Sequence, residues 1–219
     1  MEQDRESRSF LNTAAIILAG GKGSRFGGRK QEIVFHGKPL WMYPYDLVRR
    51  FLPKSNVVVV GRDVEGGSTR SGSVVNGLKA LPEATKHVVI FEAARPLVSQ
   101  EQVLKMLMAA DDSVTLVRPL VNTVVGRDGT YYDRSSMYEL LVPQAFNYRK
   151  LLEAYLSGRF PDMTDETRVM YEYHGIKPVF IEAGENLFKV TYPSDISILE
   201  SIFQRQTIND KNKEERHEA

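Results

Sequence analysis

A short apolar segment that runs into a glycine-rich, basic loop constrains this sequence most. The segment covers residues 13–19, and glycines follow at positions 20, 21 and 23. This pattern predicts a buried strand and then a loop with little side-chain bulk. Two lysines and two arginines lie between Lys22 and Lys30. Because glycine-rich backbone can approach an oxyanion closely, we predict a phosphate-binding loop, with a glycine-rich turn that carries solvated charges as the alternative.

The composition excludes several classes of protein. The chain has 219 residues with 29 basic and 28 acidic side chains, so a broad electrostatic surface for nucleic acid is not expected. The absence of cysteine excludes disulfides and thiolate metal sites. No apolar run approaches the roughly 18 residues that a membrane span needs, and residues 1–12 lack the apolar core of a signal peptide. We therefore expect a cytoplasmic protein without a membrane or nucleic-acid partner.

Strand and helix patterns alternate along the chain, which predicts an α/β fold with a mostly parallel sheet and helices on both faces. The predicted strands are residues 13–19, 56–61, 87–91, 113–117, 178–183 and 187–190. The predicted helices are residues 39–52, 71–81, 99–110, 147–157, 164–173 and 193–203, and Pro44 is expected to strain or kink the first of them. Residues 13–203 are expected to form a single domain between flexible tails at 1–12 and 204–219.

A hairpin interrupts this alternation after the fourth strand. Thr123–Val125 and Thr130–Tyr132 flank the turn sequence Gly126–Gly129. An inserted hairpin in an α/β chain often forms an arm that reaches a partner. We therefore expect an arm at about residues 122–134.

Two further clusters fall where predicted strands or loops end. A hydroxyl-rich loop at Gly66–Ser68 leads into a helix that carries Ser73, which suits contact with a ribose or a phosphate. A helix cap after a turn is the alternative. Glu92 and Arg95 follow the third strand, either as groups beside a substrate hydroxyl or metal, or as a local ion pair. The glycine loop itself lacks the Lys-Ser/Thr ending of a P-loop ATPase and the third glycine of a dinucleotide-binding loop.

Together the motifs resemble the family of 2-C-methyl-D-erythritol 4-phosphate and ribitol-5-phosphate cytidylyltransferases, which have a Rossmann-like, glycosyltransferase-A-like fold. Residues 134–138 look more like the ribitol-phosphate branch. The motifs that carry the resemblance are Ala19–Phe26, Lys30-Gln31, Arg70, Ser73-Val74, Gly77-Leu78, Ala93–Pro96, Thr123, Pro143-Gln144, Phe146, Thr164–Glu166, Lys189–Thr191, Pro193 and Asp195.

The resemblance implies transfer of CMP from CTP to a polyol phosphate, with release of pyrophosphate and a requirement for Mg²⁺. Its catalytic residues match Arg25, Lys30 and Lys189. Its nucleotide-binding residues match Ala19, Gly20, Gly21, Lys22, Gly23, Gly66, Gly67, Ser68 and Ser73. Its acceptor-binding residues match Glu92, Arg95, Thr123, Arg134 and Thr164. Mg²⁺ is expected mainly on the CTP phosphates, with Glu92 as a candidate ligand, and the arm is expected to cross a homodimer interface.

The segment between Val60 and Gly66 and the glycine loop before Lys30 are shorter than is usual in the family. Three substitutions on the acceptor side also depart from the family pattern. Glu92 and Asn122 stand where the family usually has Asp, and Val142 stands where it usually has Thr. The extra methylene of Glu92 moves its carboxylate by about 1.5 Å. Two alternatives therefore stay open: a nucleotidyltransferase for another base or a sugar phosphate, and a catalytically inactive nucleotide-binding homologue.

Overall fold

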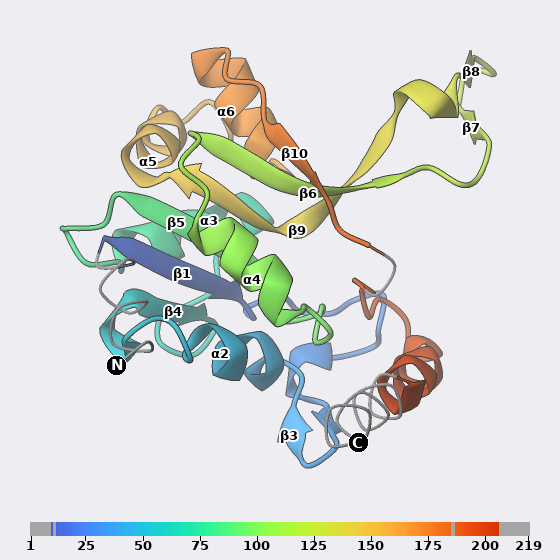
Figure 1. Cartoon of the computed structure of the whole chain (residues 1–219), viewed down its shortest axis with the longest axis horizontal. Coiled ribbons are helices and arrows are strands. Elements are labelled where there is room, and N and C mark those ends of the chain that lie inside the picture. Colours follow the sequence, from blue (N-terminus) through green and yellow to red (C-terminus); the bar gives the residue numbers. More distant parts are fainter. Residues whose placement is uncertain (1–9, 11, 185–186, 206–219) are drawn as a thin grey trace, which may run out of the picture.

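A six-stranded sheet forms the centre of the molecule (Figure 1). The computed structural model describes residues 10, 12–184 and 187–205. The strands are β1 (Thr13–Leu18), β4 (Val57–Val60), β5 (His87–Glu92), β6 (Ser113–Pro119), β9 (Tyr138–Asn147) and β10 (Val179–Glu182). Their order across the sheet is β10-β6-β9-β5-β1-β4, and β9 alone runs antiparallel to its neighbours. The predicted α/β class with a mostly parallel sheet is confirmed.

Helices cover both faces of the sheet, as predicted. Successive residues of β1 point to opposite faces, so Ala15 and Ile17 belong to one buried cluster, whereas Ala14 and Ile16 belong to another. The first cluster is closed by α2 (Met42–Val48) and α4 (Gln100–Leu107). The second is closed by α3 (Arg70–Lys79), α5 (Tyr148–Leu156) and α6 (Glu166–His174). A strand buried on both faces explains the nearly continuous apolar run that precedes the glycine loop.

The proline in the first predicted helix does not strain it. Helix α2 begins at Met42 rather than at Pro39, so Pro44 lies in its first turn. The first four N–H groups of a helix have no partner within the helix, and the missing N–H of proline therefore costs nothing there. The predicted kink was wrong because the helix is shorter than its apolar spacing suggested.

Two strand assignments also differ from the prediction. Strand β9 extends through Pro143 to Asn147 and lies between β5 and β6, and its register with β6 skips Val142 and Pro143. Proline has no N–H for the hydrogen-bond ladder of a central strand, and the irregular register accommodates Pro143. Conversely, residues 187–190 form no strand: in the described part of the chain their one backbone-to-backbone hydrogen bond runs from Val190 N to Ala94 O (2.8 Å).

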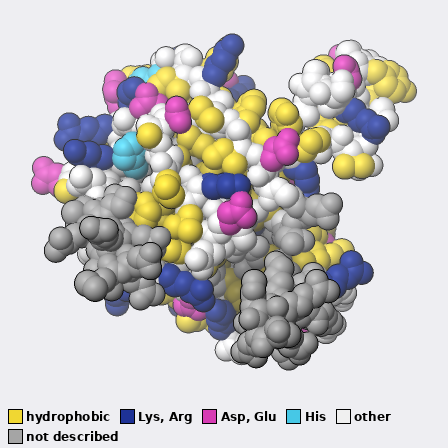
Figure 2. Space-filling view, viewed as in Figure 1, with side chains coloured by type: hydrophobic (Ala, Val, Ile, Leu, Met, Phe, Trp, Pro, Cys, Tyr) yellow, Lys and Arg dark blue, Asp and Glu magenta, His cyan; other side chains and the backbone are white. Residues whose placement is uncertain are grey.

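The predicted hairpin is present as an arm that extends away from the sheet (Figure 1). Strands β7 (Val124–Val125) and β8 (Tyr131–Tyr132) pair antiparallel, and Gly126 N donates to Thr130 O across the turn. A short 3₁₀ helix, η3 (Arg134–Ser136), leads back to β9. Figure 2 shows hydrophobic side chains gathered on this arm, and Tyr131 is 78% exposed.

A small third core lies beside the glycine loop. It packs the hairpin of β2 (Val34–Phe35) and β3 (Lys38–Pro39) against the helix at residues 195–205. Short 3₁₀ helices, η1 (Lys30–Glu32) and η2 (Lys54–Asn56), complete the connections. Of the expected tails, residues 1–9, 11 and 206–219 lie outside the described residues, whereas Phe10 is buried in the main core and residues 204–205 are helical. Among the helices that the structure describes, none is long and apolar enough to cross a membrane.

Candidate active site

The glycine loop and the loop after β4 pack backbone against backbone. Ala19 N donates to Val60 O (2.9 Å), which continues the pairing of the two strands into the loops. A Cβ on Gly20 would lie 2.9 Å from the Cα of Gly66, so a side chain there would push the loops apart. Gly67 N donates to Ser73 Oγ (3.0 Å) and so fixes the second loop to the first turn of α3. Both predicted nucleotide-binding segments therefore meet at the carboxyl ends of β1 and β4.

The three glycines of the first loop have different roles. Gly20 makes the close contact with Gly66, and Gly23 has a φ of +67° in a turn closed by Gly28. A Cβ on Gly21 would meet no atom within 4 Å. The open space beside Gly21 is therefore available to a ligand. The backbone at this position is fixed, because Gln31 Nε2 donates a hydrogen bond to the carbonyl of Gly21 (2.9 Å).

Two adjoining cavities flank this loop. A cavity of about 560 Å³ is lined by all nine predicted nucleotide-binding residues, together with Ser24, Arg29, Gly61, Glu65, Thr69 and Arg70. A smaller cavity of about 180 Å³ is lined by all three predicted catalytic cations, with Glu92, Gln31, Arg70, Ser73 and the ends of β1 and β5. Gly21, Arg70 and Ser73 contribute to both cavities. The two predicted sets thus form neighbouring parts of one concave surface.

Two of the predicted catalytic cations, Lys30 and Lys189, are held by groups from distant parts of the chain. Lys30 Nζ donates to Val190 O (2.7 Å), which ties η1 to the segment that carries Lys189. Burial, and then the nearby charge of Lys189, lower the pKa of the Lys30 ammonium below its usual value, with Arg25 acting in the same direction. An anion that entered this cavity would relieve that repulsion. The cations therefore favour a negatively charged ligand.

Glu92 lies at the centre of this positive cluster. Its Oε2 is 2.8 Å from Lys189 Nζ and 3.4 Å from Arg95 Nε, and its Oε1 is 3.7 Å from Arg70 Nε. Burial alone would raise the pKa of the Glu92 carboxyl, but Lys189, Arg70 and Arg95 outweigh burial and hold that pKa below its ordinary value. Glu92 is therefore ionised and balances part of the positive charge in the cavity.

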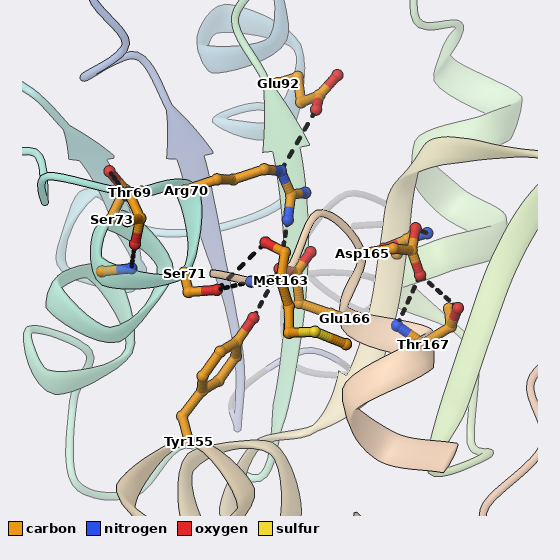
Figure 3. A network of polar contacts seen from close by, with 12 residues as sticks. Thr69, Arg70, Ser71, Ser73, Glu92, Tyr155, Met163, Asp165, Glu166 and Thr167 are labelled. Carbon is orange, nitrogen blue, oxygen red and sulfur yellow. Dashed lines mark hydrogen bonds and ion pairs between the residues drawn. The ribbon is translucent and has the colours of Figure 1, made fainter. Parts of the chain in front are cut away.

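Arg70 lines both cavities, and neither it nor its buried partner Glu166 was given a role in the sequence analysis. Arg70 begins α3, and its guanidinium lies between Glu92 and Glu166 (Figure 3). Burial would lower the pKa of the Arg70 guanidinium, but Glu166 and Glu92 raise it above its ordinary value. Both residues belong to motifs that carried the resemblance. The signal that marked them was an arginine at a helix start and an acid at the start of α6.

Four predicted acceptor residues do not line either cavity in the described part of the chain. Arg95 is 7% exposed, and its Nη1 donates to Leu187 O (3.0 Å), so it supports the segment before Lys189. Thr123 and Arg134 lie on the exposed arm, where Arg134 donates to Val121 O. Thr164 is exposed in the loop before α6. Of the predicted acceptor set, only Glu92 lies in a cavity.

The residues present do not form a metal site by themselves. Among the described residues, no group of three His, Cys, Asp or Glu side chains could hold a metal ion. Glu92 is the single carboxylate that lines the smaller cavity, and Lys189 is its ion-pair partner. Mg²⁺ commonly binds through one or two carboxylates plus substrate phosphates. The protein groups therefore fit a Mg²⁺ ion that is held mainly by a nucleotide.

Most of the chain matches one protein family. Residues 40–205 match the family model of 2-C-methyl-D-erythritol 4-phosphate cytidylyltransferase. The chain belongs to this family. The match begins at residue 40, so it does not include the glycine loop with Arg25 and Lys30. The assignment of that loop to the site depends on the geometry described above.

Individual family members match over most of their length. The 2-C-methyl-D-erythritol 4-phosphate cytidylyltransferase of Thermotoga neapolitana is 31% identical over 214 residues, which cover 86% of this chain and 95% of that protein. The enzyme of the same name from Mannheimia succiniciproducens is 28% identical over 92% of this chain and 99% of its own.

The fold agrees with solved structures of family members. The 4-diphosphocytidyl-2C-methyl-D-erythritol synthase of Anaerococcus prevotii superposes with a TM-score of 0.74 at 22% identity, covering 91% of this chain and 99% of that one. The 2-C-methyl-D-erythritol 4-phosphate cytidylyltransferase of Thermus thermophilus gives a TM-score of 0.71 at 23% identity, over 87% and 98%. At these identities the structures establish the fold, and the site rests on this chain's own residues.

Proposed function

We propose that the protein is a cytidylyltransferase that transfers CMP from CTP to a polyol phosphate similar to 2-C-methyl-D-erythritol 4-phosphate. The observation that carries this proposal is the convergence of Arg25, Lys30 and Lys189 on one cavity beside a glycine loop. The adjoining larger cavity offers small side chains and backbone at Gly66–Ser68, which suits a nucleoside. Family membership supplies the base and the class of acceptor.

In this reaction a phosphate oxygen of the acceptor attacks the α-phosphorus of CTP in line. A new P–O bond forms to the acceptor, the bond from the α-phosphorus to the bridging oxygen breaks, and pyrophosphate leaves with that oxygen. Phosphoryl-type transfer depends on positioning and on charge stabilisation rather than on covalent help from the protein. We assign those roles to the backbone of the glycine loop and to the three cations. Mg²⁺ bound to the triphosphate would neutralise further phosphate charge.

The acceptor belongs on the Glu92 side of the smaller cavity. Glu92 lines this cavity, and its carboxylate can accept hydrogen bonds from polyol hydroxyls. The arm supports a homodimer in which Thr123 and Arg134 of one subunit approach the acceptor in the other. Exposed apolar side chains at Val121, Val125 and Tyr131 favour such burial against a second copy. Both substrates are phosphorylated metabolites, which fits a cytoplasmic enzyme.

An assay of pyrophosphate release tests the proposal. The protein is incubated with CTP, Mg²⁺ and a panel of polyol phosphates that includes 2-C-methyl-D-erythritol 4-phosphate and ribitol 5-phosphate. Turnover with CTP and one of these acceptors supports the proposal, and no turnover across the panel contradicts it. Thermal unfolding with each of the four nucleoside triphosphates identifies the base, because a ligand at 100 times its dissociation constant stabilises the fold by about 2.7 kcal/mol.

A further inference from the structure

Glu166 is a fully buried carboxylate that no step of the proposed reaction uses. Its side chain is 0% exposed, and its Oε1 accepts hydrogen bonds from Arg70 Nη1 and from Tyr155 Oη, the latter at 2.9 Å (Figure 3). Burial, and then the neighbouring carboxylate, raise the pKa of the Tyr155 hydroxyl, so it remains a proton donor to Glu166. A buried charge needs such partners, because an isolated carboxylate in an apolar interior is strongly disfavoured.

Arg70 is shared between this buried carboxylate and the one in the cavity. Its Nη1 contacts Glu166, whereas its Nε lies 3.7 Å from Glu92 Oε1. The stronger contact is therefore the one with Glu166. Glu92 directs its other oxygen to Lys189, at 2.8 Å. In order of contact, the four side chains are Glu166, Arg70, Glu92 and Lys189.

We propose that Glu166, supported by Tyr155, is a positioning residue that keeps Arg70 from closing on Glu92. With Arg70 anchored, Glu92 is available to Lys189 and to an acceptor. Without the charge of Glu166, Arg70 is drawn toward Glu92, the remaining carboxylate among the four side chains. The Glu92 carboxylate then moves away from Lys189, and it is less well placed to accept hydrogen bonds from the acceptor. This role rests on the proposed function only in its effect on turnover, since the position of Arg70 can be observed directly.

The contacts around Glu166 allow this role to be separated from a structural one. The start of α3 is tied to the loop before α6 without Glu166, because Thr69 Oγ1 donates to Pro161 O (2.8 Å) and Met163 N donates to Ser71 Oγ (2.7 Å). Asp165 caps α6 through Thr167 N (2.9 Å) and thereby fixes the backbone at residue 166. The backbone that lines the larger cavity should therefore keep its position when the Glu166 charge is removed.

The experiment compares Glu166→Gln with the wild type, and uses Glu172→Gln as a matched control. Glu172 lies on the same helix and pairs with Arg168 at the surface. Crystal structures should show the Arg70 guanidinium closer to Glu92 in Glu166→Gln, with a longer distance from Glu92 to Lys189. The dissociation constant for CTP, measured by calorimetry, should stay within about twofold, while kcat/KM for the acceptor should fall about tenfold. Tyr155→Phe should show a smaller change in the same direction.

A coupled variant shows whether Glu166 acts through Arg70. In an Arg70→Lys background, the further effect of Glu166→Gln on the acceptor kcat/KM should largely disappear, because residues that act as a unit are not additive. An unmoved Arg70 guanidinium in Glu166→Gln would overturn the inference. So would equal losses of CTP binding and acceptor turnover, which indicate a structural role. If the wild type turns over no acceptor, the proposed function fails, and the two crystal structures still decide the position of Arg70.

Discussion

Lys189 Nζ lies 2.8 Å from Glu92 Oε2, although the two residues are far apart in the sequence. The pair joins the end of β5 to the segment after β10 and places a lysine over the cavity before any ligand is bound. A preformed cation of this kind needs no reorganisation when charge develops on a phosphate. The acidic partner also prevents Lys30 and Lys189 from repelling each other without compensation.

Removal of either lysine to which we assign a catalytic role should abolish most of the turnover. In Lys30→Ala and in Lys189→Ala we expect kcat with CTP to fall by about 10²–10³, the range that follows loss of one preorganised donor. The fold should persist, because the core clusters do not depend on either ammonium. Single-turnover kinetics and far-UV circular dichroism measure the two effects.

Lys105→Ala provides the matched control for both lysines. Lys105 pairs with Glu101 on the exposed side of α4, and exposed ion pairs of this type contribute little. Its turnover should equal that of the wild type. Normal rates in Lys30→Ala and Lys189→Ala would show that these cations do not act on the reacting phosphates.

Gly67→Ala should push the loop at Gly66–Ser68 away from the start of α3. A Cβ at residue 67 would lie 2.4 Å from the carbonyl carbon of Gly72, and a backbone atom cannot move aside as a flexible side chain can. We expect the dissociation constant for CTP to rise at least about tenfold, since shifts forced by overpacking typically cost about 1–3 kcal/mol. Gly28→Ala, where a Cβ meets nothing within 4 Å, should bind CTP normally in the same titration.

The predicted nucleotide-binding residues lie together in the structure because each of the two segments is local in the sequence. The glycine loop and the loop at Gly66–Ser68 each follow a buried strand, and parallel strands bring such loops to one edge of the sheet. No long-range information beyond the strand order was needed. All nine of these residues accordingly line one cavity.

The network around Glu166 could not be derived in the same way. Its contacts join the start of α3, the end of α5 and the start of α6, which lie far apart in the sequence. Arg95 shows the opposite case: acceptor binding and a local ion pair with Glu92 were both open, and its guanidinium lies 3.4 Å from Glu92 and donates to Leu187 O inside the protein. Burial and pairing partners of a single charged residue are set by tertiary packing, which local patterns do not report.

Acid should destabilise the wild type through Glu92. The pKa of this carboxyl in the folded protein lies below its ordinary value of 4.5, so its contribution to stability is complete above that value and is lost as the pH falls toward the folded pKa. Urea unfolding of the wild type and of Glu92→Gln across this range measures the contribution. The unfolding free energy of the wild type minus that of Glu92→Gln should be constant near neutral pH. Below pH 4.5 this difference should fall, because the wild type loses the contribution of ionised Glu92. A difference that does not change with pH would show that Glu92 is not stabilised in its ionised form.

Glu92→Asp should alter use of the acceptor more than binding of CTP. The shorter side chain withdraws the carboxylate by about 1.5 Å, which lengthens its contact with Lys189 and moves it away from the acceptor side. We expect KM for the acceptor to rise several-fold and the dissociation constant for CTP to stay within about twofold. Steady-state kinetics with the acceptor varied at saturating CTP measure the first quantity, and calorimetry measures the second. A larger effect on CTP than on the acceptor would place Glu92 in the nucleotide part of the site.

Arg134→Ala should weaken the acceptor site in the neighbouring subunit of the proposed homodimer. Arg134 lies on the arm, outside both cavities of its own chain, and it is exposed. If the arm reaches a second copy, a dimer of Arg134→Ala and Lys30→Ala chains contains one site with both defects and one site with neither. Mixing the two weakly active variants should therefore restore activity, up to about half of the wild-type turnover per mixed dimer.

Two measurements make this test decisive. Sedimentation should first show a dimer for each variant and for the mixture. Activity is then followed as the ratio of the two chains changes, and it should be highest near equal amounts. A mixture whose activity is only the average of the two variants would show that Arg134 acts within its own subunit or not at all.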